Sequence, residues 1–431
     1  MRMLVKEHPL RRALHNEVHA RPPEPMTAPL AISHLVMLAD GDARQASRAH
    51  LAALLRDHHL PIPDEHANHL RVDMGSWRLR WELHTEFVTW TFMADAPMGL
   101  PKGEDYDLAM RRLPQAWLKA LPGECLAHIQ LWAKLTQDLS DRDELHQQFR
   151  EDSLVACQLA EGAATLHTDF QIDPHGCSRM LLRVDQLSQR RLGRLVQRLL
   201  EIETYRMMAL LGLPIARSAV PALAAAEQEL ADLAQAIRSA SHDQEAQLLD
   251  RLTRLAGQVE GLYASQHSRF SASKAYFELV DRRIKDIRET RLPGFQSIGE
   301  FMDRRLSPAR STCDWVAKRQ TALSERVSRM SNLLRTRVDF QQEQSSQALL
   351  TAMNKRQGMQ LKLQTTVEGL SVAAITYYIA GLVHYMAEGL QAKGWIPDPA
   401  MATAVAVPFI ALVIWWITRR LHYKVLKTDK P

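Results

Sequence analysis

The sequence predicts a mixed α/β (α+β) N-terminal domain, then a long helical stalk, then a C-terminal transmembrane hairpin. Strand-like alternation and short apolar runs fill residues 30–185, helical spacing dominates residues 221–364, and two long apolar stretches follow. A period of two residues indicates strands, and recurrence every three or four residues indicates helices. We therefore expect a cytosolic α/β domain at 1–200, a coiled-coil stalk at 201–364, and a hairpin with a basic tail at 365–431.

Composition narrows the function classes. The 431 residues carry a formal net charge of only +5, and Lys and Arg are interspersed with Asp and Glu, which argues against a nucleic-acid partner. The four cysteines lie far apart without metal-ligand spacing, at Cys125, Cys157, Cys177 and Cys313. The first twelve residues lack the apolar run of a signal peptide. Most of the chain is therefore expected in the reducing cytosol.

The N-terminal domain is expected to contain several strands in succession. "LAISHLVML" (30–38) is typical of a buried strand, and residues 42–60 have helical spacing. In "SWRLRWELHTEFVTWTFMAD" (76–95) the pattern alternates and predicts one apolar and one ionisable face. The apolar face would carry Trp77, Leu79, Trp81, Leu83 and Phe87, and the ionisable face Arg80, Glu82, His84 and Glu86. Further strands are expected at 125–135, 153–172 and 178–185, which gives the sheet an antiparallel component.

Site chemistry is expected in this domain, because fourteen of the eighteen histidines precede residue 176. The opening "HPLRRALHNEVHARPP" (8–23) predicts a short helix with an anchoring face of Leu10, Leu14 and Val18. His8, Arg12, His15 and His19 would share the opposite face. A zinc-protease motif is excluded, since Glu17 does not directly follow His15. Metal binding by His15 and His19, capture of an acidic partner or phosphate, and simple docking remain open.

Two other clusters are candidate sites. His66 and His69, three residues apart in "RDHHLPIPDEHANHL", are weak candidates for holding a divalent metal ion, and a solvated loop is the alternative. The ionisable face of Arg80, Glu82, His84 and Glu86 is the better candidate, because a carboxylate beside a histidine is usable for acid–base catalysis. An exposed strand face whose charges pair with one another is the simpler alternative. No cofactor is predicted, although a divalent metal is compatible with either cluster.

The stalk is expected to be built from long helices. "SHDQ" (241–244) has the form of a capping box, and leucines then recur at spacings of three and four through Leu262. Breaks are expected at "RLPGFQSIGEF" (291–301) and "LSPARS" (306–311), followed by a continuous helix that enters the first apolar span. We expect this stalk to support homo-oligomers, without fixing their number.

Two spans are expected near the C-terminus, at 367–386 and 400–418, each close to the ~20 residues that cross a bilayer. Basic residues flank both spans on their outer sides, and the intervening loop holds only Lys393, so both termini should be cytoplasmic. One face of the first span is mostly small and ends in a histidine: Gly369, Ala373, Thr376, Ala380 and His384. This face would pack against another helix or line a pore.

Four segments together resemble a family of bacterial membrane-anchored proteins known only as a domain of unknown function. They are "LHNEVHARPP", "RWELHTEFVTWTF", "RLVQRLLEIETYRMMALLGLP" and "LQTTVEGLSVAAITYYIAGLV". The resemblance implies a multi-pass protein of the bacterial inner membrane, and it brings no reaction, substrate or cofactor. Its site-like positions on the helical segment are Glu201, Glu203, Tyr205 and Arg206.

The leading functional hypothesis is an oligomeric interaction or scaffolding protein in the lipid bilayer, with a cytosolic protein as its partner. The layout also has a distant likeness to CorA-type cation channels, which makes a divalent-ion channel or transporter the alternative. The Gly-Met-Asn signature of those channels is missing after the first span, where "VHYMAEG" stands. A membrane-bound enzyme is the third hypothesis, and shared layout alone decides none of them.

Overall fold

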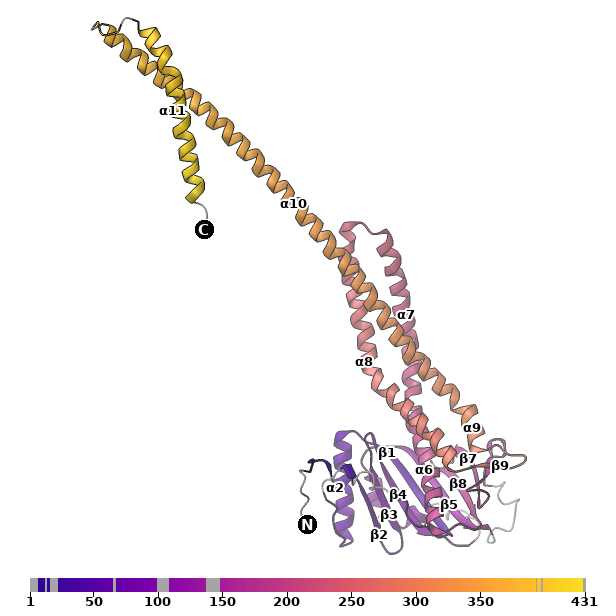
Figure 1. Ribbon diagram of the computed structural model, residues 1–431. Coiled ribbons are helices and arrows are strands. Elements are labelled where there is room, and N and C mark those ends of the chain that lie inside the picture. Colours follow the sequence, from indigo (N-terminus) through magenta and orange to yellow (C-terminus); the bar gives the residue numbers. More distant parts are fainter. Residues whose placement is uncertain are drawn as a thin grey trace. The chain divides into compact units, whose positions relative to one another are not determined.

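The computed structural model describes residues 7–11, 14–15, 22–64, 67–98, 108–136, 148–392, 394–396 and 398–428, without the side chains of 242–243 and 421–428. The chain divides into two compact units, Met1–Ser331 and Asn332–Pro431. The first unit contains a mixed sheet with helices, and the second is helical (Figure 1). The expected order of a mixed α/β sheet domain, a long helical region and a C-terminal helix is confirmed.

Nine strands form one sheet in the order β2-β3-β4-β1-β5-β8-β7-β6-β9. Among the described strands, only the β5–β8 pair is parallel, and the remaining pairs are antiparallel, as the runs of consecutive strands predict. The strands are β1 (Leu30–Leu38), β2 (His69–Asp73), β3 (Arg78–Leu83), β4 (Phe87–Asp95), β5 (Glu124–Leu135), β6 (Val155–Leu159), β7 (Ala164–Ile172), β8 (Ser178–Val184) and β9 (Thr290–Arg291).

Helices cover both faces of the sheet. On one face, α6 (Gln189–Leu210) packs Leu195 and Leu199 against side chains such as Ile32 of β1. On the other face, α2 (Gly41–Asp57) packs Leu51 against Trp90 of β4. Strand β1 is buried on both faces, which is why its sequence is an almost continuous apolar run. The short α3 (Leu108–Arg111), α4 (Gln115–Lys119) and 3₁₀-helix η3 (Glu151–Ser153) connect the strands.

The alternating segment 76–95 forms a hairpin rather than one strand. His84 N–H donates to the Phe87 carbonyl, so β3 ends before His84 and β4 begins at Phe87. Trp77, Leu79, Trp81 and Leu83 share one core as expected. Phe87, however, packs with Met208 of α6 on the opposite side, so its predicted placement is wrong. The turn reverses the chain and thereby breaks the simple period of two.

Gly193 explains how α6 lies so close to the N-terminal segment. A Cβ added at this glycine would lie 1.6 Å from the carbonyl oxygen of Glu24. The close approach allows Met26 N–H to donate to the Gln189 carbonyl, and Arg78 to pair with Glu24 at 3.1 Å. Gly193 thus fixes the contact between α6 and residues 22–27.

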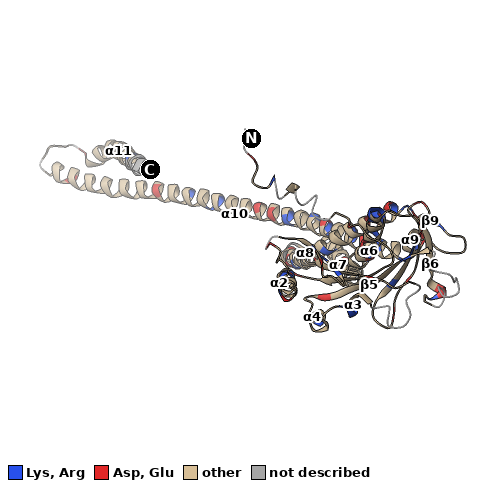
Figure 2. Cartoon of the chain, turned by 90° about the horizontal axis from the view of Figure 1, so that it is seen from below, with Lys and Arg blue, Asp and Glu red and all other residues tan. Residues whose placement is uncertain are grey.

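Long helices follow the sheet. Helices α7 (Gly212–Ser239) and α8 (His242–Asp286) come after α6, and Ser241 and Gln244 form the predicted capping box. After α9 (Ile298–Arg305), the chain enters α10 (Ser307–Gln391), which is the continuous helix expected from the sequence. Charged residues become sparse in the C-terminal part of α10 (Figure 2). The last helix, α11, spans Pro399–Thr428.

Candidate functional site

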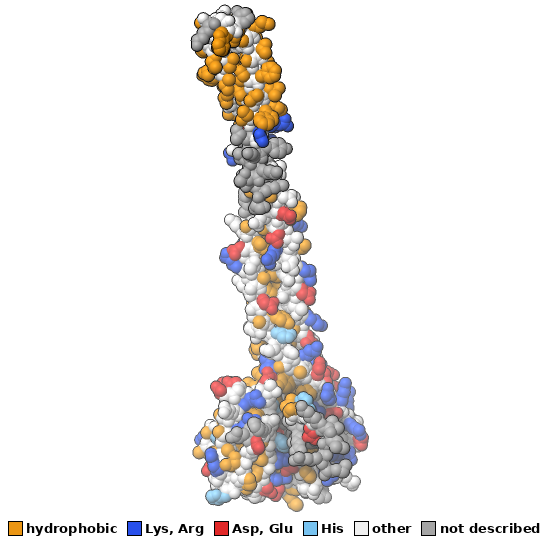
Figure 3. All heavy atoms as spheres, turned by 60° about the vertical axis from the view of Figure 1, so that its left-hand side comes forward, with side chains coloured by type: hydrophobic (Ala, Val, Ile, Leu, Met, Phe, Trp, Pro, Cys, Tyr) orange, Lys and Arg blue, Asp and Glu red, His pale blue; other side chains and the backbone are white. Residues whose placement is uncertain are grey.

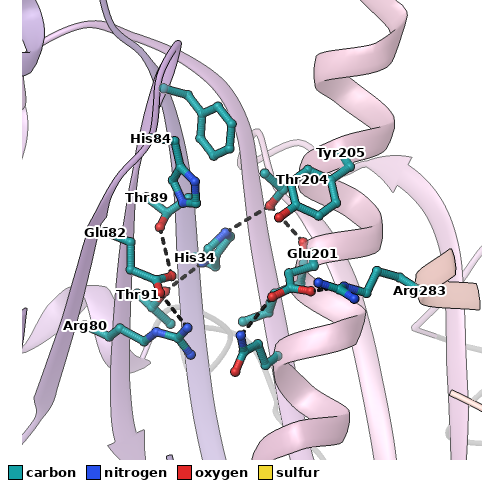
Figure 4. Close-up of a pocket in the computed structure, with 13 residues that line it drawn as sticks. His34, Arg80, Glu82, His84, Thr89, Thr91, Glu201, Thr204, Tyr205 and Arg283 are labelled. Carbon is teal, nitrogen blue, oxygen red and sulfur yellow. Dashed lines mark hydrogen bonds and ion pairs between the residues drawn. The ribbon is translucent and has the colours of Figure 1, made fainter. Parts of the chain in front are cut away.

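A cavity of about 250 Å³ lies between the sheet and two helices of the first unit (Figure 4). Strands β1, β3 and β4 form one wall, and helices α6 and α8 form the other. We call this cavity the sheet–helix pocket. Its lining residues are His34, Arg80, Glu82, His84, Phe87, Thr89, Thr91, Gln197, Leu200, Glu201, Thr204, Tyr205 and Arg283.

The strand wall holds a buried ion pair. Arg80 and Glu82 are two residues apart on β3 and therefore point to the same face, where Arg80 Nη2 lies 2.6 Å from Glu82 Oε1. Both residues are more than nine-tenths buried, because α6 covers this face. The two charges pair along the strand, as in the simpler alternative for this face, but the face is covered rather than exposed. Arg80 Nε has no hydrogen-bond partner among the described residues.

The helix wall holds a second ion pair opposite the first. The Arg283 guanidinium on α8 contacts the Glu201 carboxylate on α6 and also reaches Asp286 at 3.2 Å. Burial lowers the pKa of Arg283, but the Glu201 carboxylate outweighs burial and raises that pKa above its ordinary value. The Gln197 amide donates to Glu201 at 2.8 Å, while its Oε1 has no partner among the described atoms.

His34 lies between the two walls and is held as a neutral imidazole. The Thr204 hydroxyl donates to the Leu200 carbonyl at 2.8 Å, so its oxygen accepts the hydrogen bond from His34 Nε2 at 3.2 Å. Nδ1 then accepts from the Thr91 hydroxyl at 2.7 Å, which assigns the Nε2–H tautomer. Burial lowers the pKa of His34 to about 3, although the Glu82 carboxylate opposes this shift.

The mouth of the pocket is aromatic. The His84 ring stacks on Phe87 with centroids 4.2 Å apart, and Tyr205 of α6 stacks on Tyr276 of α8 at 5.9 Å. The Glu86 carboxylate, in the turn between β3 and β4, accepts from Arg269 at 2.8 Å and from the Tyr276 hydroxyl at 3.0 Å. These bonds tie the turn to α8. Burial, with the Glu86 charge, raises the pKa of Tyr276 above its ordinary value.

A second hollow of about 290 Å³ adjoins this mouth and shares His84, Phe87 and Tyr205 with the sheet–helix pocket. The combined site offers two carboxylates, three guanidinium groups, hydroxyl groups and an aromatic rim. Such a set can orient a small polar molecule by hydrogen bonds while the rings contact its apolar part. The fully buried His34 holds Thr91 and Thr204 in place and does not present a free ring nitrogen.

The structure brings together one predicted cluster and not the others. Arg80, Glu82 and His84 line the pocket, and Glu86 lies in the adjoining turn. His15 is exposed, and so are Leu10 and Leu14, so their predicted anchoring face is not packed. Glu17, His19 and Val18 lie outside the described residues.

The predicted metal pair is only half described. His69 begins β2 opposite Glu82, whereas His66 lies outside the described residues. No group of three or more His, Cys, Asp or Glu side chains placed to hold a metal ion occurs in the described part of the chain. The metal hypothesis for His66 and His69 stays a prediction.

The small-residue face of α10 divides into two parts. His384 Nδ1 lies 3.0 Å from the Thr403 hydroxyl of α11, and Thr376 and Ala380 are half-buried on the same side. Gly369 and Ala373 are exposed. A Cβ at Gly369 would meet nothing within 4 Å.

Comparison with known proteins identifies the family. The model of a protein family described as "Protein of unknown function (DUF3422)" matches residues 6–425. The chain belongs to the DUF3422 family. The resemblance predicted from the four sequence segments is thereby confirmed. Searches of curated proteins and of solved structures found no match, so the likeness to CorA-type channels is not shown.

The residues singled out on the family segment "RLVQRLLEIETYRMM" have different roles. Glu201 and Tyr205 line the pocket. Glu203 and Arg206 instead form a buried pair at 2.9 Å that Ser178 of β8 joins at 3.4 Å. The sequence argument missed His34, Thr91, Thr204 and Arg283. A single histidine inside the apolar run "LAISHLVML" was the signal available for His34.

Proposed function

We propose that this DUF3422 protein is an oligomeric interaction protein anchored in the bacterial inner membrane by α10 and α11, with both termini cytoplasmic. The observation that supports the anchor best is the exposure of apolar side chains on these helices (Figure 3). In the apolar window of α10, 0% of the residues are buried, and in that of α11 only 6%. Contiguous apolar surface of this size needs lipid or protein to cover it.

The ends of the proposed spans fit a bilayer boundary. Arg419 lies over the Trp415 ring at 5.0 Å, and Arg420 lies over Trp416 at 4.9 Å. Aromatic rings and cations are both favoured at the membrane interface, and an excess of Lys and Arg favours the cytoplasmic side. The His384–Thr403 hydrogen bond would satisfy two polar groups within lipid, which supports packing rather than a pore for this face.

Self-association would occur along α10 before the first span. Residues 351–366 are all exposed, and they include Met353, Met359 and Leu363. A single helix with this exposure gains little from burial, and helical stability in proteins comes mainly from packing. A second copy of the same helix is the partner we propose, and a cytosolic protein would bind the first unit.

Membrane fractionation tests the anchor. We expect the full-length protein to stay in the membrane pellet after carbonate washing, and a variant that ends at residue 366 to move to the supernatant. With a phosphatase reporter that is active only outside the cytoplasm, a fusion after residue 431 should be inactive, and an insertion at Gly394 in the loop should be active. A truncated protein that remains in the pellet, or an active C-terminal reporter, would contradict the topology.

Light scattering of the detergent-solubilised protein tests the oligomer. We expect a mass above that of one 49.0 kDa chain. Substitution of Met353 and Leu363 by Glu should lower this mass to one chain. Reconstitution in liposomes tests the alternative of a divalent-ion channel, because only a channel predicts metal flux.

A second candidate function is binding of a small polar molecule in the sheet–helix pocket. The specific support is Arg80 Nε, a buried donor without a partner among the described residues, beside a 250 Å³ cavity. Buried polar groups are nearly always hydrogen-bonded, so water or a ligand is expected there. Thermal-shift screening against polar metabolites tests this function, with Arg80→Lys as the variant that should lose the response.

A further inference from the structure

A second cleft in the first unit is distinct from the pocket described above. It lies between the first three turns of α6 and the end of α8, and its volume is about 340 Å³. We call it the basic cleft. Five of its lining residues are cationic: Arg191, Arg194, Arg198, Lys285 and Arg288. In Figure 2, Lys and Arg positions gather on the side of this unit where α6, α9 and β9 meet.

The carboxylates present do not neutralise this group. Asp286 is the only acidic residue of the lining, and Arg283 already binds its carboxylate at 3.2 Å. Glu161, in the β6–β7 turn, contacts both Arg288 and Arg191, the latter at 3.8 Å. Five cations therefore face two carboxylates, and like charges held this close repel one another unless an anion joins them.

Two of the cationic side chains have no partner among the residues that the structure describes. Arg198 donates to the Asp286 carbonyl at 2.9 Å, which uses part of its guanidinium. The side chains of Arg194 and Lys285 make no hydrogen bond or ion pair with any described residue. Their charged groups border the cleft and remain available to a ligand.

Helix electrostatics explains only half of this arrangement. Lys285 and Arg288 lie at the C-terminal end of α8, where the helix dipole favours cations. Arg191 and Arg194 lie near the N-terminal end of α6, which has no acidic residue in its first turn and where the dipole favours anions. The α6 arginines are thus placed against the dipole, and the same dipole would add to the attraction of a bound anion.

Backbone strain also gathers at the basic cleft. Among the described residues, five that are not glycine have a positive φ, and three of them are Ala160 (52°), Glu161 (67°) and Arg288 (47°). Ala160 and Arg288 line the cleft, and Glu161 pairs with Arg288. The position after a helix usually carries Gly when its φ is positive, so an arginine there has a conformational cost. Strain of this kind tends to persist at binding sites.

We infer that the basic cleft binds a phosphorylated ligand with at least two negative charges. Arg194 and Lys285 would donate to the phosphate oxygens, and Arg191 and Arg198 would supply further charge. Guanidinium groups match phosphate geometry, and a cleft of this size accepts a phosphate ester or pyrophosphate group. The inference is independent of the membrane anchor and of the sheet–helix pocket.

Calorimetric titration of the full-length protein in detergent, with inorganic pyrophosphate as the probe, tests this inference. We expect saturable binding that weakens as ionic strength rises. Replacing Arg194 and Lys285 together by Glu should weaken binding at least about tenfold, since each charge-assisted hydrogen bond contributes about 1.5–3 kcal/mol. If the two Glu substitutions disturb folding, the milder Arg194→Gln/Lys285→Gln variant replaces them in the test. It should also show weaker pyrophosphate binding.

A matched control distinguishes a loss of binding at the basic cleft from a general effect of the protein's net charge. Arg217 and Arg238 are exposed on α7, and neither makes a hydrogen bond or ion pair with a described residue. The Arg217→Glu/Arg238→Glu variant changes net charge equally and should retain pyrophosphate affinity within about twofold. Absence of saturable binding, or equal weakening in both double variants, would overturn the inference.

Competition distinguishes two sources of the phosphate group. Glycerol phosphate represents a soluble ester, and short-chain phosphatidic acid represents a lipid headgroup. If glycerol phosphate displaces pyrophosphate at a lower concentration than phosphatidic acid does, the ligand is a soluble phosphate ester. Stronger displacement by phosphatidic acid would identify a lipid, and either result supports the phosphate site.

Discussion

Two regions of this molecule have similar hydropathy and opposite surroundings. By length and composition, three helical stretches of the described chain could cross a membrane: Gln189–Ser239, Ser307–Gln391 and Pro399–Arg420. In the first, which is α6 and α7, a third of the apolar window is buried, and α6 places its leucines on the sheet. In the other two, almost none of the window is buried. Hydropathy finds apolar helices, and only the rest of the fold decides what covers them.

The distribution of apolar residues around each helix accounts for this difference. Buried residues of α6 recur at Leu192, Leu195, Val196 and Leu199, which is one stripe, while Arg191, Arg194 and Arg198 occupy other positions. A single apolar stripe needs one covering surface, and the sheet supplies it. The C-terminal part of α10 has exposed apolar residues in close succession, as at Tyr377, Tyr378 and Ile379. A helix that is apolar on every side needs a surrounding apolar phase.

The largest contrast is expected for charged residues. Arg80→Met leaves Glu82 buried without its partner and should lower the free energy of unfolding by about 3–5 kcal/mol. Arg335→Met, at an exposed position on α10, should change it by less than about 0.5 kcal/mol. Urea unfolding of the full-length protein in detergent, followed by tryptophan fluorescence, measures both. The double variant Arg80→Met/Glu82→Gln should recover much of the loss, and no recovery would mean that the pair does not act as a unit.

A leucine pair sharpens the same comparison. Leu199 is 1% exposed in the core of α6 and the sheet, whereas Leu370 on α10 is 73% exposed. Leu199→Ala should cost about 2–5 kcal/mol, because a cavity remains after the side chain is removed. Leu370→Ala should leave the unfolding midpoint of the first unit unchanged. Equal effects of the two substitutions would show that α10 is covered by protein in solution.

Two glycines allow a comparison between a position in close contact with another segment and a position with open space around it. Gly193→Ala places a methyl group against the Glu24 carbonyl and should destabilise by about 1–3 kcal/mol. Gly369→Ala meets nothing within 4 Å and should be neutral or add up to about 1 kcal/mol of helix stability. Thermal unfolding of both variants, followed by the loss of helical signal, shows whether each substitution lowers or raises stability. A destabilising Gly369→Ala would instead point to a partner helix packed against that glycine.

The sequence predicted elements well where their periodicity is local. The bounds of β1 follow the apolar run 30–38, the capping box begins α8, and one helix covers the region from Trp315 into the first apolar span. These features depend on neighbours within a few residues. The hairpin turn at His84 was missed because "LHTEF" contains no Gly, Pro or Asn to mark a turn, and Phe87 was assigned to the wrong face as a result.

The pocket was only half predictable for a different reason. Arg80, Glu82 and His84 were identified because their alternation on one strand is visible in the sequence. Whether this face is exposed or covered stayed open, because coverage by α6 depends on contacts about 120 residues away in the chain, a long-range property that periodicity does not encode. Arg283 joins the pocket from α8 through its pair with Glu201, and nothing in its local sequence marks it.

His34 provides the last expected effect, which is a pH dependence that is absent at neutral pH and develops only in acid. Burial disfavours the charged ring and lowers the pKa of His34 from its ordinary value of 6.5 to about 3 in the folded protein. Above pH 6.5 neither state binds the proton, so the contribution of His34 to stability is fully present. Between pH 6.5 and 3 only the unfolded state binds it, and the free energy of unfolding falls as pH falls.

The expected slope from this residue approaches about 1.4 kcal/mol per pH unit within that window. Urea unfolding at several pH values should show this slope in the wild type as an excess over His34→Gln, whose amide can still donate to Thr204 but does not titrate. All other titrating groups are common to both proteins and cancel in the difference. Parallel profiles would mean that His34 binds its proton equally well folded and unfolded, and the neutral imidazole between Thr91 and Thr204 would then be wrong. An excess slope confined to this window would instead establish that the folded α/β unit holds the His34 ring in its neutral form, between Thr91 and Thr204.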